Sequence, residues 1–166
     1  MNKNEQYKKE INEWINKFQP THFLTVQLPE NLKTADIEMS KSNLQKFMAS
    51  FEYRLIGRSW HKKHLFFIAI SEHGHSEKWH YHILFNCGQY KDEDLQDALL
   101  KTVSALKYPL YTFDLRPIES CPDYVTTYTT KEIRIKDYNQ FDSQRIIPST
   151  VLFNVSYHEL KISAPR

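Results

Sequence analysis

Two histidines, His80 and His82, stand one residue apart within the stretch WHYHILF at residues 79–85. On a β-strand, side chains two residues apart point to the same face, so the two imidazoles would lie side by side. Imidazole nitrogens held that close can share one divalent metal ion. Alternatively, both histidines face solvent opposite an aromatic core face, because the residues that alternate with them are Trp, Tyr, Ile and Phe. The first interpretation predicts a metal site on a strand.

Glu72 could supply a third metal ligand. It ends an almost continuously apolar stretch, residues 65–72, which is typical of a central strand covered on both faces. Six polar residues, 73–78, then lead to the histidine strand, and this indicates a β-hairpin that brings Glu72 beside the imidazoles. Two imidazoles and a carboxylate with open positions suit a catalytic Mg²⁺ or Mn²⁺ better than a closed structural Zn²⁺. His73 and His75 remain rival third ligands.

A second group of reactive side chains lies within residues 123–133. If this segment is helical, Tyr124, Tyr128 and Lys131 fall on one face, because side chains three or four residues apart meet on a helix. A tyrosine phenol can act as a covalent nucleophile when its oxyanion is stabilised, and a lysine or a metal can provide that stabilisation. An ordinary amphipathic helix would show the same spacing. The three side chains are therefore candidate catalytic residues.

Helices and strands are predicted to alternate around these candidates. Apolar residues at helical spacing predict helices over about 5–18, 42–56 and 92–107. The second would begin at a capping box at Ser42 and end before Gly57. Strand-forming residues predict strands over 22–28 and 110–116 in addition to the hairpin, and the tail offers only a short helix or strand near 151–155. The order predicts an α+β fold, a mainly antiparallel central sheet with helices packed on its faces.

Composition favours one folded intracellular domain. The 166 residues suffice for a single core, and 40% hydrophobic residues with 14% aromatic ones argue against a disordered chain. We expect one domain over residues 1–166, with its core at about 20–135. Cys87 and Cys121 are too few for a disulfide framework. No stretch is apolar and long enough for a signal peptide or a spanning helix, so no membrane partner is expected.

One short segment is clearly cationic although the net charge is only +2. Sites that bind single-stranded nucleic acid combine cations, which meet phosphates, with aromatic rings, which stack on bases. A solvated loop before a strand would have a similar composition. The segment supplies the candidate DNA-binding residues Arg58, Trp60, Lys62 and Lys63.

Three motifs follow one another along residues 22–133: FLTVQLP at 23–29, His80-Tyr81-His82, and Tyr128-Thr129-Thr130-Lys131. In this order they resemble the motifs of the HUH endonucleases of the rolling-circle replication initiator (Rep) type. The pair Tyr124 and Tyr128 also resembles the two-tyrosine members, which include phage replication proteins. In those a lysine often precedes the second tyrosine, where this chain has Thr127. Whether Tyr124 is a second nucleophile therefore stays open.

The resemblance implies a ferredoxin-like or RRM-like core and a nuclease that starts rolling-circle replication. Such proteins bind single-stranded DNA at an origin hairpin or terminus, and a tyrosine, here Tyr128, forms a 5′-phosphotyrosine link and frees a 3′-OH. His80, His82 and Glu72 would then bind Mg²⁺ or Mn²⁺. The chain has no Gly-x-x-x-x-Gly-Lys loop, so unwinding would need a helicase or polymerase partner, or a longer protein.

Two other functions remain as alternatives. One is a single-strand DNA transposase of the HUH class, although such enzymes tend to carry Gln where this chain has Lys131. The other is a non-catalytic α+β module whose aromatic sheet stacks the bases of RNA or single-stranded DNA.

Overall fold

A five-stranded antiparallel sheet forms the centre of the protein. The structure is a computed structural model and describes residues 3–28, 37–73, 79–87, 89–106, 112–120, 146–156 and 160–161. The strands of the sheet are β1 (His22–Gln27), β3 (Phe67–His73), β4 (Trp79–Phe85), β5 (Thr112–Pro117) and β6 (Ile146–Pro148). Their spatial order is β5-β1-β4-β3-β6. Two short strands, β2 (His64–Leu65) and β7 (Leu160–Lys161), pair in parallel outside this sheet.

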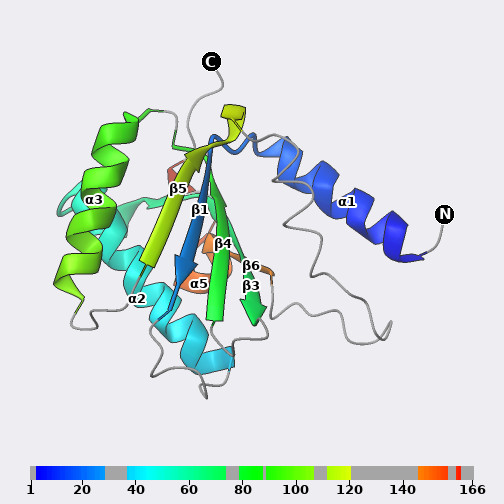
Figure 1. Cartoon of the computed structure of the whole chain (residues 1–166), viewed down its shortest axis with the longest axis horizontal. Helices are drawn as coiled ribbons and strands as arrows, with labels where there is room; N and C mark the ends of the chain where they lie inside the picture. The colour runs from blue at the N-terminus through cyan, green and yellow to red at the C-terminus, as the bar shows by residue number, and fades with distance from the viewer. Residues whose placement is uncertain are drawn as a thin grey trace.

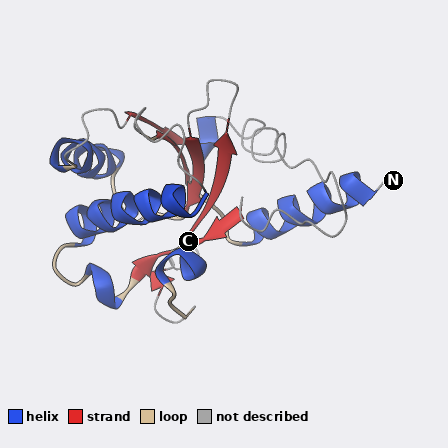
Figure 2. Cartoon of the chain, turned by 90° about the horizontal axis from the view of Figure 1, so that it is seen from below, coloured by secondary structure: helices blue, strands red, loops and turns tan. Residues whose placement is uncertain are grey.

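Helices lie on both sides of the sheet. They are α1 (Lys3–Lys17), α2 (Ile37–Ile56), α3 (Asp92–Ala105) and the short α5 (Ser149–Phe153), with 3₁₀ turns η2 (Trp60–Lys62) and η3 (Ile118–Ser120). Figures 1 and 2 show α2 and α3 on one side of the sheet and α1 on the other. The order β1-α2-β3-β4-α3-β5 is that of a βαββαβ unit, so the predicted α+β fold is confirmed.

The two faces of the sheet belong to different cores. The larger core packs α2 and α3 against Tyr81, Ile83 and Phe85 of β4 together with residues of β1 and β3. The smaller core, on the opposite face, includes Ile11 and Ile15 of α1 together with Phe23, Ile68, Ile70 and Leu84. The residues of β4 thus alternate as predicted, and His80, His82 and Leu84 share the face of the smaller core.

The predicted start of the second helix at Ser42 is wrong. Helix α2 already includes Ile37, and Ser42 is an exposed residue within it. Tertiary contacts explain the difference, because the buried Ser40 places its Oγ 2.5 Å from Oη of the buried Tyr81 on β4. The predicted end is confirmed. Gly57 follows the helix with φ +88°, a conformation that favours glycine, and its N–H donates to the carbonyl oxygen of Tyr53 at 2.9 Å.

The predicted strand over residues 65–72 is in fact divided. Leu65 belongs to β2, and β3 begins only at Phe67. The cause is the buried Glu52 of α2, whose Oε1 accepts the backbone N–H of Leu65 at 2.9 Å. The other oxygen of Glu52 lies 2.6 Å from Nδ1 of His64, and burial raises the pKa of this carboxyl group.

The other predicted elements agree with the structure apart from small shifts at their ends, whereas the sequence does not predict β6 and β7. The predicted helix over 92–107 is α3, the strand over 110–116 is β5, and the short element near 151–155 is the helix α5. The helix predicted within 123–133 lies outside the described residues. Among the helices that the structure describes, none is both long enough and apolar enough to cross a membrane.

Candidate functional site

The predicted hairpin of β3 and β4 brings Glu72 next to the two histidines. In the antiparallel register, Glu72 is the partner of His80, and Ile70 is the partner of His82. Since partners in an antiparallel pair lie on the same face, Glu72, His80 and His82 share one face of the sheet. On the other side of β4, the strand β1 places Thr25 opposite His82 and Gln27 opposite His80.

Glu72 and His82 are in direct contact. The Oε2 atom of Glu72 lies 2.8 Å from the Nε2 atom of His82. The side chain of His82 is 7% exposed and that of Glu72 is 26% exposed. The carboxylate is therefore the part of the pair that solvent or a ligand reaches.

Two further contacts fix the His82 ring. The ring of Phe23 stacks on it, with centroids 5.4 Å apart and planes 15° from parallel. The hydroxyl oxygen of Thr25 lies 3.1 Å from His82 Nδ1. Both ring nitrogens of His82 thus have a polar partner, one on β1 and one on β3.

The donor atoms of this pair fit a small divalent cation. Adjacent ligands about 2.1 Å from an octahedral Mg²⁺ or Mn²⁺ lie about 3 Å apart, close to the Glu72–His82 separation. A carboxylate oxygen and an imidazole nitrogen are also donors that Mn²⁺ accepts. Among the described residues, however, no group of three or more His, Cys, Asp or Glu side chains is close enough together to hold a metal. The structure thus brings together two of the three predicted ligands, with His80 at the neighbouring register position.

The rival third ligands differ in position from Glu72. The backbone of His73 pairs with Trp79, so Glu72 and not His73 is the partner of His80 in the register. His75 lies outside the described residues, and so do the candidate catalytic residues Tyr124, Tyr128 and Lys131.

Tyr81, between the two histidines in the sequence, has no features of a nucleophile. Its side chain is fully buried in the larger core, on the face opposite His82. Burial raises the pKa of its phenol to about 12, so the phenolate form is disfavoured.

The cationic segment lies apart from the Glu72–His82 pair. Arg58, Lys62 and Lys63 are exposed, and Trp60 is half-buried with its ring edge-on to His64. These residues lie in and around η2, before the start of β3, whereas Glu72 is near the end of that strand. The five residue-to-residue steps of the strand from Phe67 to Glu72 span about 17 Å. The structure does not bring this candidate DNA-binding segment to the predicted ligands.

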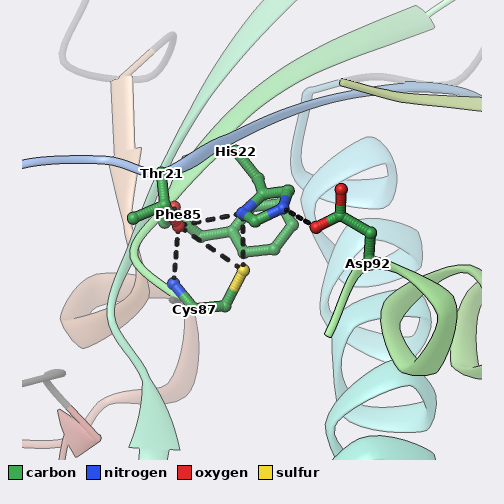
Figure 3. Close-up of polar contacts among 5 residues, drawn as sticks. All are labelled: Thr21, His22, Phe85, Cys87 and Asp92. Carbon is green, nitrogen blue, oxygen red and sulfur yellow. Dashed lines mark hydrogen bonds and ion pairs between the residues drawn. The ribbon is translucent and has the colours of Figure 1, made fainter. Parts of the chain in front are cut away.

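A second polar cluster, which the sequence did not reveal, joins β1, the end of β4 and α3 (Figure 3). The His22 ring lies between two partners, with Nε2 2.9 Å from Oδ1 of Asp92 and Nδ1 3.1 Å from Sγ of Cys87. The hydroxyl of Thr21 accepts the backbone N–H of Cys87 at 3.0 Å. The residue types resemble a cysteine-histidine-aspartate nucleophile system, but the Cys87 side chain is 0% exposed. Burial also raises the pKa of its thiol to about 12. The cluster therefore joins elements rather than performing chemistry.

Native Cys87 is accordingly expected to resist thiol reagents. Only the thiolate attacks iodoacetamide, and burial keeps this thiol both protonated and inaccessible. We expect alkylation at pH 8 to be at least about 100-fold slower in the folded protein than in urea. Peptide mass spectrometry measures Cys87 separately from Cys121. Alkylation of Cys87 at equal rates with and without urea would contradict this prediction.

The chain matches the family model described as Replication-associated protein ORF2/gene 2 protein over residues 21–133. It therefore belongs to this family, whose members are replication initiators. The matched stretch begins just before β1 and includes Glu72, His80 and His82. No curated protein and no solved structure gives a significant match to the chain.

Proposed function

We propose that the protein is a metal-dependent endonuclease and strand-transferase of the HUH type, which nicks single-stranded DNA at a specific site and so initiates rolling-circle replication. The observation that carries the proposal is the 2.8 Å contact between Glu72 and His82 on neighbouring strands, in a chain of a replication-associated family. A carboxylate and an imidazole at this distance suit Mg²⁺ or Mn²⁺, the ions that phosphodiester chemistry commonly uses.

In this proposal Glu72, His82 and His80 hold the metal ion. The strand register supports the inclusion of His80, because it is the partner of Glu72 and shares the face with His82. The bound ion would polarise the scissile phosphate and spread the charge of its transition state. The protein would contribute ligands that are fixed on strands, and strands position side chains more precisely than loops do.

Tyr128 is the proposed nucleophile. Its phenolic oxygen would lose its proton and attack the phosphorus atom, forming a P–O bond to the tyrosine. The bond between phosphorus and the 3′ oxygen would break, leaving a 5′-phosphotyrosine and a free 3′-OH. Lys131 would stabilise the phenolate, and Tyr124 could attack in a second round. Because the phosphodiester energy is kept in the new bond, attack by a 3′-OH would rejoin the strand without ATP.

Single-stranded DNA at an origin hairpin or terminus is the proposed partner. Arg58, Trp60, Lys62 and Lys63 would contact this DNA away from the scissile phosphate, because they lie at the other end of β3 from Glu72. A helicase or polymerase partner, or another part of a longer protein, would supply the unwinding, since these 166 residues contain no phosphate-binding Gly-Lys loop.

Labelled oligonucleotides test the proposal directly. The full chain is incubated with Mn²⁺ and single-stranded DNA that carries different labels at its two ends, then separated on a denaturing gel. We expect the 3′-end label to migrate with the protein and the 5′-end label to appear in a shorter free strand. EDTA should remove both products. If a panel of origin-like hairpins is bound on a native gel but never linked covalently, the protein is a binding module and the proposal is wrong.

A further inference from the structure

Thr25 occupies a particular position beside the Glu72–His82 pair. It lies on β1, is half-buried, and is the register partner of His82 on one side and of Asp114 on the other. Its hydroxyl oxygen is 3.1 Å from His82 Nδ1, on the edge of the ring opposite the Glu72 contact at Nε2.

The stacking of Phe23 does not by itself decide which way the His82 ring faces. A nearly parallel stack at 15° fixes the plane of the ring, but a half-turn of the ring within that plane keeps the same stacking. Such a turn would exchange the two edges of the ring, so Nε2 would no longer point at Glu72. The polar contacts with Glu72 and with Thr25 both distinguish the two orientations, and of these two partners Thr25 is the one that is not itself a proposed metal ligand.

A hydroxyl suits this position because it can both donate and accept. An imidazole binds a metal through an unprotonated nitrogen, so a metal at Nε2 requires the proton on Nδ1. The Thr25 oxygen would then accept the Nδ1–H bond. When no metal is bound, the same hydroxyl can donate to Nδ1 while Nε2–H donates to Glu72. Thr25 therefore accommodates both states of the ring without leaving a buried nitrogen unpaired.

We propose that Thr25 is a positioning residue, which holds the His82 ring with Nε2 towards the metal and accepts the hydrogen bond from Nδ1–H when the metal is bound. This inference rests on the proposed function, because it needs His82 to be a metal ligand. It goes further because it assigns a task to a side chain on β1 that acts through His82 and not as a metal ligand itself. Residues that orient a metal-bound histidine in this way typically change metal affinity 10- to 100-fold when they are replaced, roughly the effect we expect.

Calorimetric titration with Mn²⁺ alone, on the full chain, tests the proposal without any DNA. Thr25→Val removes the hydroxyl but keeps the branched shape that suits a strand, and we expect its Mn²⁺ affinity to fall about 10- to 100-fold. Thr25→Ser restores a hydroxyl and should recover most of the affinity. The matched control is Thr112→Val. Thr112 is an exposed threonine on β5, opposite Gln27 and on the same face of the sheet as Thr25. The Thr112→Val variant should bind Mn²⁺ with the same affinity as the original protein. Thermal unfolding confirms that each variant is folded.

The outcomes separate this inference from the proposed function. If the original protein binds Mn²⁺, His82→Ala does not, and Thr25→Val binds as tightly as the original, Thr25 has no positioning role although the metal site stands. If Thr25→Ser binds Mn²⁺ as weakly as Thr25→Val does, the loss of affinity comes from altered packing rather than from the missing hydroxyl, and the inference is wrong. If the original protein fails to bind Mn²⁺, or His82→Ala binds it equally well, the proposed metal site fails and the inference fails with it.

Discussion

Replacing Tyr128 by phenylalanine is expected to abolish the covalent protein–DNA adduct. Phenylalanine keeps the ring but lacks the oxygen that would form the bond to phosphorus, so the side chain at position 128 could no longer form the adduct. Removing the nucleophile of a covalent enzyme typically lowers the rate by on the order of 10⁴- to 10⁶-fold. The measurement is the band of labelled DNA that stays with the protein on a denaturing gel. Binding of single-stranded DNA, followed on a native gel, should change little, because phosphate contacts dominate such affinities.

Tyr124→Phe is the matched control for this variant. Tyr124 stands four residues before Tyr128, and the change removes the same atom. We expect the first cleavage to persist in Tyr124→Phe, whereas a reaction that needs two successive attacks would stop after one. The reverse pattern, an adduct with Tyr128→Phe and none with Tyr124→Phe, would move the nucleophile to Tyr124.

His82→Ala is expected to remove metal-dependent cleavage while leaving much of the DNA binding. The substitution deletes the imidazole that contacts Glu72 and so removes one of the two donors that the structure brings together. The loss of Mn²⁺ affinity should exceed the roughly 10- to 100-fold effect of residues that only orient a ligand. Mn²⁺ titration and cleavage of the labelled oligonucleotide measure the two effects separately.

His61→Ala serves as the histidine control. His61 is exposed in η2, near the start of β2 and away from Glu72. The His61→Ala variant should bind Mn²⁺ with the original affinity and cleave DNA at the original rate when the DNA is saturating. Full cleavage by His82→Ala would exclude His82 as a ligand. Glu72→Gln provides an independent check, because it keeps the shape of the side chain but removes the charge that a cation needs.

The positions of the proposed ligands on β3 and β4 could be predicted, because they depend on residues that are close together in the sequence. The shared face of His80 and His82 follows from the two-residue period of a strand alone. Glu72 lies beside them because the hairpin connection is short and leaves few registers in which both strands bury their apolar faces.

Contacts between distant parts of the chain could not be predicted in the same way. Thr25 and His82 are 57 residues apart, and their contact depends on the register of β1 against β4. The division between β2 and β3 depends on Glu52, a helix residue that takes the N–H of Leu65. No local pattern predicts either contact, since both are products of how the elements pack. The same holds for the bridge from His22 to Cys87 and Asp92.

The folded unit extends beyond the stretch that the family model matches. Residues 21–133 contain neither α1 nor β6, yet α1 covers Phe23 and Leu84, and β6 pairs with β3 from Ile68 to Ile70. A fragment trimmed to 21–133 would expose the apolar side chains beneath α1. It would also leave the backbone N–H and C=O groups along the outer edge of β3 without the partners that β6 provides. Strands with such unpaired edges pair readily with other chains. Such a fragment should therefore be prone to self-association, and expression of the domain calls for boundaries that retain both elements.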